Sequence, residues 1–232
     1  MSYTLTIPKF EPIINFEICV PLDNSCAFHF LLGPNGCGKT LLARSILGLN
    51  GNNSSLYEDN LPKIIIDKPQ LRRYLPQNPQ DALFPQFSLN DNIFLLNKLF
   101  KIKKPLENKM ILDLLKTKSS NQKVSTLSVG QKKKLLMQFI ISSLPNEMSS
   151  NSDPIVVVLD EPFAGIDKNF SPTIQEMLNS VAGSFQNTDV YFLIIEHETL
   201  INIHSCANSN TVTLRKGIDL KIVYSNEIEL KL

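Results

Sequence analysis

Residues 33–40 read Gly-Pro-Asn-Gly-Cys-Gly-Lys-Thr, which matches the pattern G-x-x-x-x-G-K-[ST]. They follow the apolar run Ala27–Leu32, which fits a buried strand, and they precede Thr40–Leu49, where apolar residues recur at helical spacing. Glycines allow successive backbone N–H groups to surround phosphate oxygens, and the start of a helix adds partial positive charge. The segment therefore predicts a phosphate-binding loop between a strand and a helix.

Two side chains in this loop have specific chemical roles. Lys39 is expected to meet the β- and γ-phosphates, and the hydroxyl of Thr40 is expected to bind Mg²⁺. The residues predicted to contact the nucleotide here are Gly33, Pro34, Asn35, Gly36, Cys37, Gly38, Lys39, Thr40 and Leu41. Cys37 has two interpretations: a thiolate stabilised near bound phosphate, which would allow redox inhibition, or a small residue that fits the turn.

A pair of carboxylates follows another apolar run that is predicted to be a strand. Ile155–Leu159 is β-branched and apolar, as expected of a central strand covered on both faces, and Asp160 and Glu161 come directly after it. One carboxylate can hold Mg²⁺ through water while its neighbour polarises an attacking water. Tyr191–Ile195 repeats the arrangement and ends at Glu196-His197, and ligands bind at such carboxyl ends of strands. With the phosphate loop, the Asp160-Glu161 pair predicts hydrolysis of a nucleoside triphosphate.

The rest of the chain alternates strand and helix signals. Ser88 or Asn90 can cap a helix that continues through Asn92–Leu96. Further strands are predicted at Ile64–Ile66 and Leu71–Leu75, helices at Leu106–Leu115 and Val129–Leu144, a polar surface loop at Pro145–Pro154, and an edge hairpin around Gly217 within Ser205–Leu232.

Composition narrows the functional class. The 232 residues carry 23 Lys plus Arg against 22 Asp plus Glu, so there is no basic excess to favour nucleic-acid binding. No apolar run approaches the roughly 20 residues that span a bilayer, and the start MSYTLTIPKFEP lacks the pattern of a secretory signal. Cys19, Cys26, Cys37 and Cys206 form no CxxC pair, which favours reduced thiols. We therefore expect a cytoplasmic protein.

The chain resembles the ABC ATPase family, because further landmarks occur in that family's order. They are Gln77, the signature Leu127-Ser128-Val129-Gly130-Gln131, Asp160-Glu161-Pro162, Asp167 and His197. The resemblance implies one α/β domain over 1–232, with a P-loop NTPase core of mainly parallel sheet and an N-terminal antiparallel β subdomain. It places the ATP-binding core at about 1–76 and 145–232, and a small helical subdomain with the signature at 77–144.

The resemblance also assigns roles. Glu161 would be the general base, His197 would link the γ-phosphate to the attacking water, and with Lys39 they form the expected catalytic set. Thr40, Gln77 and Asp160 would contact the metal, and Gln77 would also sense a partner. Ser128, Val129, Gly130 and Gln131 would contact ATP held by an opposing subunit, with Asp167 in the loop that joins the two sites. The resemblance thus implies an ATP- and Mg²⁺-dependent dimer with two composite sites.

Some positions depart from the family pattern or stay open. Val129 stands where the signature usually has a glycine, Leu41 follows Thr40 where a second hydroxyl is common, and Ala164–Asp167 is a loose version of its loop. Phe10 is the first choice for the aromatic that stacks on adenine and Phe16 the second, although either could be core. Lys132–Lys134 is interpreted as a solvated helix face.

The resemblance favours a transport role. Single-cassette chains of the family usually pair with separate membrane proteins, and Gln77–Pro79 with Ala82–Pro85 is similar to segments of bacterial importer ATPases. We therefore predict the ATP-hydrolysing subunit of an ABC transporter, dimeric with itself or a second ABC ATPase and attached through partners to the cytoplasmic face of the membrane. Phe84, Phe87 and Leu89 are either partner contacts or core.

Two other functions remain open at this point. The first is a non-transport ABC ATPase in repair, translation or cluster assembly, although the chain has no long heptad insertion and no second cassette in tandem. The second is a phosphotransferase, which would need an acceptor-binding lid and would leave the signature unexplained. The short stretch after the last strands also predicts no added regulatory domain.

Overall fold

A computed structural model of the chain describes residues 3–7, 18–22, 28–33, 35, 39–40, 44, 47, 71–148, 155–166, 171–184, 190–196, 213–214, 218–219 and 221–225. Within these ranges, the main sheet has five strands in the order β4-β5-β6-β3-β9. Their bounds are β4 Leu71–Leu75, β5 Ile155–Asp160, β6 Val190–Glu196, β3 Phe28–Leu32 and β9 Lys221–Ser225. The predicted α/β fold with a mainly parallel sheet is confirmed.

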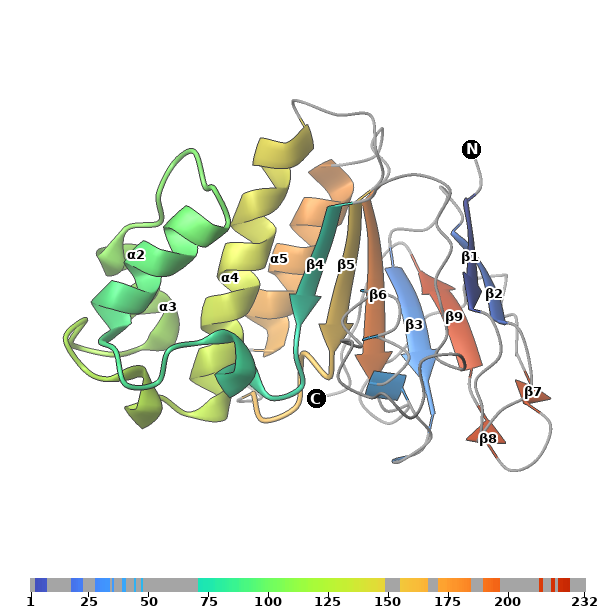
Figure 1. Ribbon diagram of the computed structural model, residues 1–232, viewed down its shortest axis with the longest axis horizontal. Helices are drawn as coiled ribbons and strands as arrows, with labels where there is room; N and C mark the ends of the chain where they lie inside the picture. The colour runs from blue at the N-terminus through green and yellow to red at the C-terminus, as the bar shows by residue number, and fades with distance from the viewer. Residues whose placement is uncertain are drawn as a thin grey trace, which may run out of the picture.

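Four of these strands run parallel, and β9 runs antiparallel to β3 at one edge. Figure 1 shows the arrowheads of β4, β5, β6 and β3 pointing the same way and that of β9 pointing back. The strands predicted at Ala27–Leu32, Leu71–Leu75, Ile155–Leu159 and Tyr191–Ile195 are all present. Every residue of β5 is buried, because helices and neighbouring strands cover a central parallel strand on all sides.

Shorter antiparallel pairs lie outside the main sheet. β1 (Tyr3–Ile7) pairs with β2 (Ile18–Leu22), and β7 (Thr213–Leu214) pairs with β8 (Ile218–Asp219). Figure 1 places β1 and β2 beyond β9. Part of the predicted edge hairpin is therefore confirmed, because β7 and β8 form an antiparallel pair. This pair is a separate sheet, and the strand at the edge of the main sheet is β9. The strand predicted at Ile64–Ile66 lies outside the described residues.

Helices form a layer against the sheet and a second group beyond it. α4 (Val129–Met148) and α5 (Ser171–Ser184) lie next to the sheet, and α2 (Leu89–Leu99) and α3 (Asn108–Leu115) lie on the far side of α4 (Figure 1). Two short 3-10 helices, η1 (Pro79–Ala82) and η2 (Val124–Thr126), flank this group. None of the described helices has both the length and the apolar character needed to cross a membrane. The exact subdomain boundaries stay a prediction.

The start of α2 decides between its two candidate caps. Ser88 accepts a hydrogen bond from the Asp91 N–H (3.1 Å), and the Asp91 carboxylate accepts one from the Ser88 N–H (3.3 Å). These reciprocal bonds form a capping box and satisfy N–H groups that a helix start leaves without partners. The cap is therefore Ser88, and Asn90 lies inside the helix.

Two predictions about α4 are wrong. The helix continues through Pro145 to Met148, so the predicted loop begins later than Pro145; the proline ring fixes φ near the helical value, which is compatible with this conformation. The solvated face predicted at Lys132–Lys134 does not exist, because these side chains are only 3, 1 and 7% exposed. α4 packs against β4, α5, α3 and η1, and the Lys132 ammonium reaches the carbonyl of Ser125 in η2.

Candidate nucleotide-binding site

The parallel strands bring the candidate residues to one edge of the sheet. Leu32 pairs with Glu196, Asp160 with Ile195, and Leu75 with Leu159, so all four strands end at nearly the same level. Gly33 follows β3 directly, and Gln77 follows β4 after Pro76. Because side chains and loops at the carboxyl ends of parallel strands form ligand sites, this edge is the candidate site.

The described part of the phosphate loop fits its predicted role. Lys39 and Thr40 are in helical conformation, which places a helix start directly after the loop. The Lys39 ammonium donates a hydrogen bond to the carbonyl of Gly33 (2.7 Å) and is 6% exposed, so its charge lies against the loop backbone. Asn35 is exposed. The other predicted contacts, Pro34, Gly36, Cys37, Gly38 and Leu41, lie outside the described residues.

Asp160 is a fully buried carboxylate at the end of β5. Burial raises its pKa above the ordinary value, while a hydrogen bond from the Thr40 hydroxyl opposes the rise. Its Oδ2 also accepts a hydrogen bond from the Tyr74 hydroxyl (3.3 Å). Its Oδ1 has no hydrogen-bond partner within the described part of the chain. A buried carboxylate oxygen in that position calls for another ligand, because such groups are costly to leave without one.

A magnesium ion fits this arrangement. The Thr40 hydroxyl and the Asp160 carboxylate are hydrogen-bonded neighbours, and both supply the hard oxygen atoms that Mg²⁺ prefers. Gln77, the third predicted metal contact, is exposed two residues after the end of β4. In the described residues, no three or more His, Cys, Asp or Glu side chains are grouped to hold a metal. Mg²⁺ in phosphate sites needs only one or two carboxylates besides phosphate oxygens and water.

Tyr74 on β4 is part of this site, although the sequence did not single it out. Burial raises the pKa of its hydroxyl to about 12, the Asp160 carboxylate adds to the rise, and a hydrogen bond from Arg44 opposes it. The hydroxyl therefore stays protonated and can donate to Asp160. Nothing in the sequence near Tyr74 signals this contact, because it depends on the pairing of β4 with β5.

Glu161, the predicted general base, begins a tight turn after β5. Its φ of 48° lies in the left-handed region, which a residue with a side chain adopts only when its surroundings impose it. The Glu161 N–H donates to the carbonyl of Ile195 on β6 (2.9 Å), and the Ala164 N–H donates to the carbonyl of Glu161 (3.2 Å). The base therefore projects from a backbone that is held on both sides.

Two buried charged residues also contact this turn, and neither was predicted to act here. The Lys133 ammonium donates to the carbonyl of Glu161, and a carboxylate oxygen of Glu196 accepts the Phe163 N–H (3.1 Å). Burial lowers the pKa of Lys133, while the charges of Glu196, Glu161 and Asp160 oppose that shift. The sequence placed Glu196 at the end of the apolar run Tyr191–Ile195 without giving it a role, and the structure shows it as the buried last residue of β6.

The signature segment begins α4. The Gln131 N–H donates to the Ser128 hydroxyl (3.1 Å), and the Ser128 N–H donates to the side-chain oxygen of Gln131 (2.9 Å). The side-chain nitrogen of Gln131 donates to the carbonyl of Leu115 at the end of α3 (2.8 Å). The Gln131 side chain is thus engaged within its own chain, while Ser128 and Val129 are exposed, the latter at 47%.

Gly130 lies against the turn that follows Glu161. A Cβ atom added to Gly130 would come within 2.5 Å of the carbonyl oxygen of Gly165 and 3.3 Å of the Ile166 Cα. Only glycine allows such a close approach of helix and backbone. The signature helix and the Glu161 turn are therefore one packed unit.

The remaining predicted residues divide into two groups. Phe10, Phe16, Asp167 and His197 lie outside the described residues, so their roles stay predictions. Of the three possible partner contacts, Leu89 is fully buried and belongs to the core, whereas Phe84 and Phe87 are 42 and 49% exposed. The rings of Phe84 and Phe87 stack with centroids 5.6 Å apart.

Known proteins resemble this chain in sequence and in fold. It is 30% identical over 178 residues to the spermidine/putrescine import ATP-binding protein PotA of Mycoplasma mycoides, covering 74% of this chain and 46% of that protein. It is 31% identical over 162 residues to the Nod factor export ATP-binding protein I of Cupriavidus pinatubonensis, covering 66% of this chain and 46% of that protein. The chain spans about half the length of the curated relatives it matches.

A solved structure shows the same fold. It is an ATP-binding cassette in a dimeric, post-hydrolysis state bound to ADP and Pi, with a TM-score of 0.52, 17% identity, and coverage of 84% of this chain and 88% of that chain. The family model described as ABC transporter matches residues 24–164, which is more than half of the sequence and includes the phosphate loop, the signature and Asp160-Glu161. The chain therefore belongs to the ABC transporter family, as one of its ATP-binding chains.

Proposed function

We propose that this chain hydrolyses ATP with Mg²⁺ and powers transport through separate membrane subunits. The observation that carries the proposal is the contact of Thr40, at the end of the phosphate loop, with the fully buried Asp160 carboxylate, whose Oδ1 has no hydrogen-bond partner among the described residues. It joins the residue that would bind the metal in the loop to the carboxylate that would hold it from β5. Glu161 follows directly, within reach of the same edge.

Each residue has a defined part in this chemistry. Lys39 and the helix start neutralise phosphate charge, and Thr40 and Asp160 hold the metal, directly or through water. Bound Mg²⁺ would supply charge neutralisation at the β- and γ-phosphates. Glu161 would accept a proton from the attacking water, and Tyr74 would keep Asp160 oriented through its hydroxyl.

The active form is proposed to be a dimer with two composite sites, formed with a second copy or with another ABC ATPase. Ser128 and Val129 are exposed at the N-terminus of α4, where N–H groups and the helix dipole favour an anion. The dimeric post-hydrolysis cassette of the same fold supports this arrangement. The name of the Mycoplasma relative refers to import and that of the Cupriavidus relative to export, which favours a transport role over the non-transport alternative and leaves its direction open.

The test of the enzymatic proposal is phosphate release by the purified chain at several protein concentrations. If sites are composite, the rate per chain should rise with protein concentration until the dimer is saturated, because each site needs two subunits. Hydrolysis should stop when EDTA removes Mg²⁺, since the Asp160 carboxylate then repels the phosphates and the charge of the metal no longer neutralises them. No phosphate release at any concentration, with folded protein and Mg-ATP present, would refute the proposal.

Phe84 and Phe87 are the proposed contacts for a membrane subunit. They form a stacked, exposed aromatic pair, and exposed apolar groups of this kind often mark interaction sites. The surface is also connected to the signature: the Val124 N–H donates to the carbonyl of Phe87 (3.0 Å) and the Ser125 N–H to that of Pro85 (2.9 Å). A partner bound here would contact the segment that leads directly into Ser128. It would hold the chain at the cytoplasmic face of the membrane.

The double variant Phe84→Ser/Phe87→Ser should lose binding to membranes from the source cell while keeping its own phosphate release. We expect the bound fraction to fall by about tenfold or more, as for loss of a central aromatic contact. The matched control is Leu99→Ser, which removes another exposed apolar side chain, at the end of α2. Equal binding of the wild type to protein-free vesicles of the same lipids, or unchanged binding of the double variant, would contradict this docking surface.

A further inference from the structure

We propose that Lys133 and Glu196 are positioning residues that together fix the turn from which Glu161 projects. The inference rests on the proposed ATPase function and concerns two residues to which that proposal assigns no contact with nucleotide or metal. Both are buried and charged, they come from different elements, and each makes a hydrogen bond to the backbone of the segment 161–163.

Lys133 makes the first of these contacts from α4. Its side chain is 1% exposed, and its ammonium donates to the carbonyl of Glu161. A buried ammonium is costly unless charges and hydrogen bonds compensate it. The compensation comes from Asp160, Glu161 and Glu196, whose carboxylates are the charges that act on Lys133. Lys133 therefore connects the signature helix to the acidic end of the sheet.

Glu196 makes the second contact from the end of β6. It is fully buried, and one of its carboxylate oxygens accepts the Phe163 N–H at 3.1 Å. The preceding residue, Ile195, accepts the Glu161 N–H through its carbonyl at 2.9 Å. The end of β6 thus holds the turn at both its first and its third residue.

The backbone of Glu161 needs this support. A φ of 48° for a residue with a side chain is costly and persists only when its surroundings determine it. Among the contacts that hold it, Ile195, Lys133 and Ala164 hydrogen-bond to the Glu161 backbone, and Glu196 holds the neighbouring Phe163. Without Lys133 and Glu196 the turn can relax to another backbone conformation. The Glu161 carboxylate is then no longer held in one position.

The same contacts couple the proposed base to the signature. Gly130 and Lys133 are three residues apart and lie on one face of α4, so both meet the turn formed by residues 161–166. A displacement of the signature helix would therefore move the carbonyl that Lys133 holds. This connects the segment that would contact the opposing subunit's ATP to the base in the same chain.

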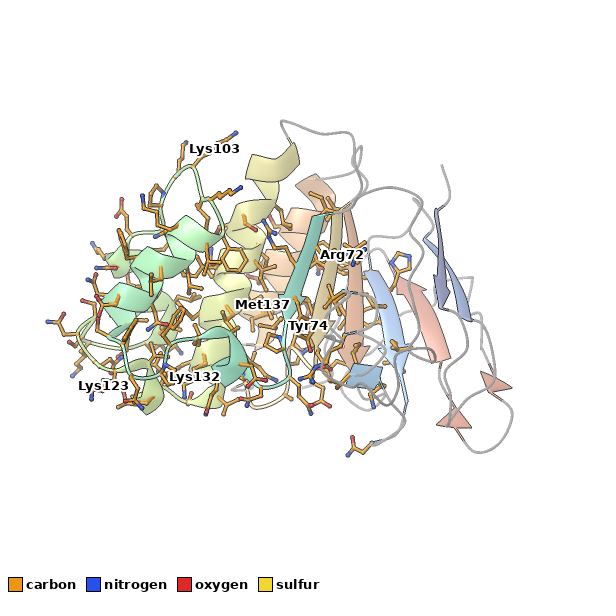
Figure 2. The ribbon with its side chains drawn as sticks, in the orientation of Figure 1. Arg72, Tyr74, Lys103, Lys123, Lys132 and Met137 are labelled. Carbon is orange, nitrogen blue, oxygen red and sulfur yellow. The ribbon has the colours of Figure 1, made fainter. Side chains whose placement is uncertain are left out.

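Lys132 provides a comparison with a purely structural buried lysine. It is 3% exposed, and its ammonium lies 3.5 Å from the carbonyl of Ser125. Figure 2 labels Lys132 near the beginning of α4 and Tyr74 on β4, on the sheet side of that helix. Replacing Lys132 or Lys133 with methionine removes one ammonium group from the same helix, and only Lys133 contacts the Glu161 turn.

The test compares steady-state ATP hydrolysis and ATP affinity for four variants. Lys133→Met should lower kcat by about tenfold to a hundredfold, as expected when a catalytic group is misplaced, with ATP affinity kept within about twofold. Lys132→Met should keep the wild-type kcat. Lys133→Arg retains a buried cation with donors and should recover part of the loss. The double variant Lys133→Met/Glu196→Gln removes one buried negative charge together with the ammonium. Its thermal stability should therefore be higher than that of Lys133→Met, while its kcat should stay as low.

Each outcome decides the inference. Recovery of both stability and kcat in the double variant would show that Lys133 only balances charge, and equal kcat values for Lys133→Met and Lys132→Met would exclude a positioning role. If Lys133→Met does not fold, the double variant with its balanced charge still reports kcat. A wild type without phosphate release would instead refute the ATPase proposal, so the two failures are distinguishable.

Discussion

Replacing Glu161 with glutamine is expected to lower ATP turnover by about a hundredfold or more, which is the range that a general base contributes. Glutamine has nearly the same shape but cannot accept a proton from water. The turn should survive, because Lys133 and Ile195 contact the backbone of residue 161 and not its side chain. ATP should therefore bind as in the wild type while phosphate release is lost.

The measurement is phosphate release beside titration with a fluorescent ATP analogue. Glu176→Gln is the matched control, because Glu176 is an exposed carboxylate on α5, and it should have wild-type turnover. Turnover of Glu161→Gln within about threefold of the wild type would mean that another group activates water, since loss of a base costs far more. Loss of ATP binding as well would show that the turn itself had collapsed.

Replacing Gly130 with alanine should destabilise the protein and remove most of its turnover. Alanine is favoured over glycine in a helix by about 1 kcal/mol, which works in favour of the variant. However, the new Cβ would lie 2.5 Å from the Gly165 carbonyl oxygen, closer than such atoms can approach. That oxygen belongs to the backbone and cannot rotate away, so α4 or the turn must move. Overpacking of this kind costs about 1–3 kcal/mol, and it outweighs the gain in helix propensity.

Thermal or urea unfolding of Gly130→Ala measures this cost, and phosphate release measures the effect on turnover. Lys109→Ala, at an exposed position on α3, is the control for alanine in a helix and should change stability by less than about 0.5 kcal/mol. The fall in turnover should exceed the loss of folded protein, because the signature and the Glu161 turn move together. A variant of Gly130 as stable and active as the wild type would show that the contact is not tight in solution.

Local patterns were enough to predict the frame of the site. The phosphate loop is continuous in sequence, and the apolar runs that became β3, β5 and β6 end at the residues that form the candidate site. Since carboxyl ends of parallel strands meet at one edge, Gly33 and Asp160 could be placed together without coordinates. The strand order and the roles of individual partners could not be derived in this way.

The three lysines at the beginning of α4 show why local patterns were not enough to predict individual partners. Lys132, Lys133 and Lys134 are consecutive, so with 3.6 residues per turn they point over more than half of the helix circumference, a pattern that normally means solvent. They are buried because α4 is enclosed at its beginning by several elements that are distant in sequence. The partner of Lys133 is 28 residues away at Glu161, and that proximity depends on how α4 packs beside β5.

Tyr74 and Pro145 illustrate the same limit in two other ways. The Tyr74 hydroxyl reaches Asp160 only because β4 and β5 pair in parallel, which no local signal near Tyr74 indicates. Pro145 is a strong local signal for a helix end, since a proline inside a helix removes a hydrogen bond and clashes with the preceding turn, yet α4 continues past it to Met148.

ATP is proposed to close a dimer in which each site is composite. The most direct test of this proposal is the mass of purified Glu161→Gln protein, measured by light scattering on a sizing column with and without ATP and Mg²⁺. We predict one chain without nucleotide and two chains with Mg-ATP, since binding persists and hydrolysis no longer reopens the dimer. A protein that binds ATP but keeps the mass of one chain at all concentrations would contradict the composite-site account.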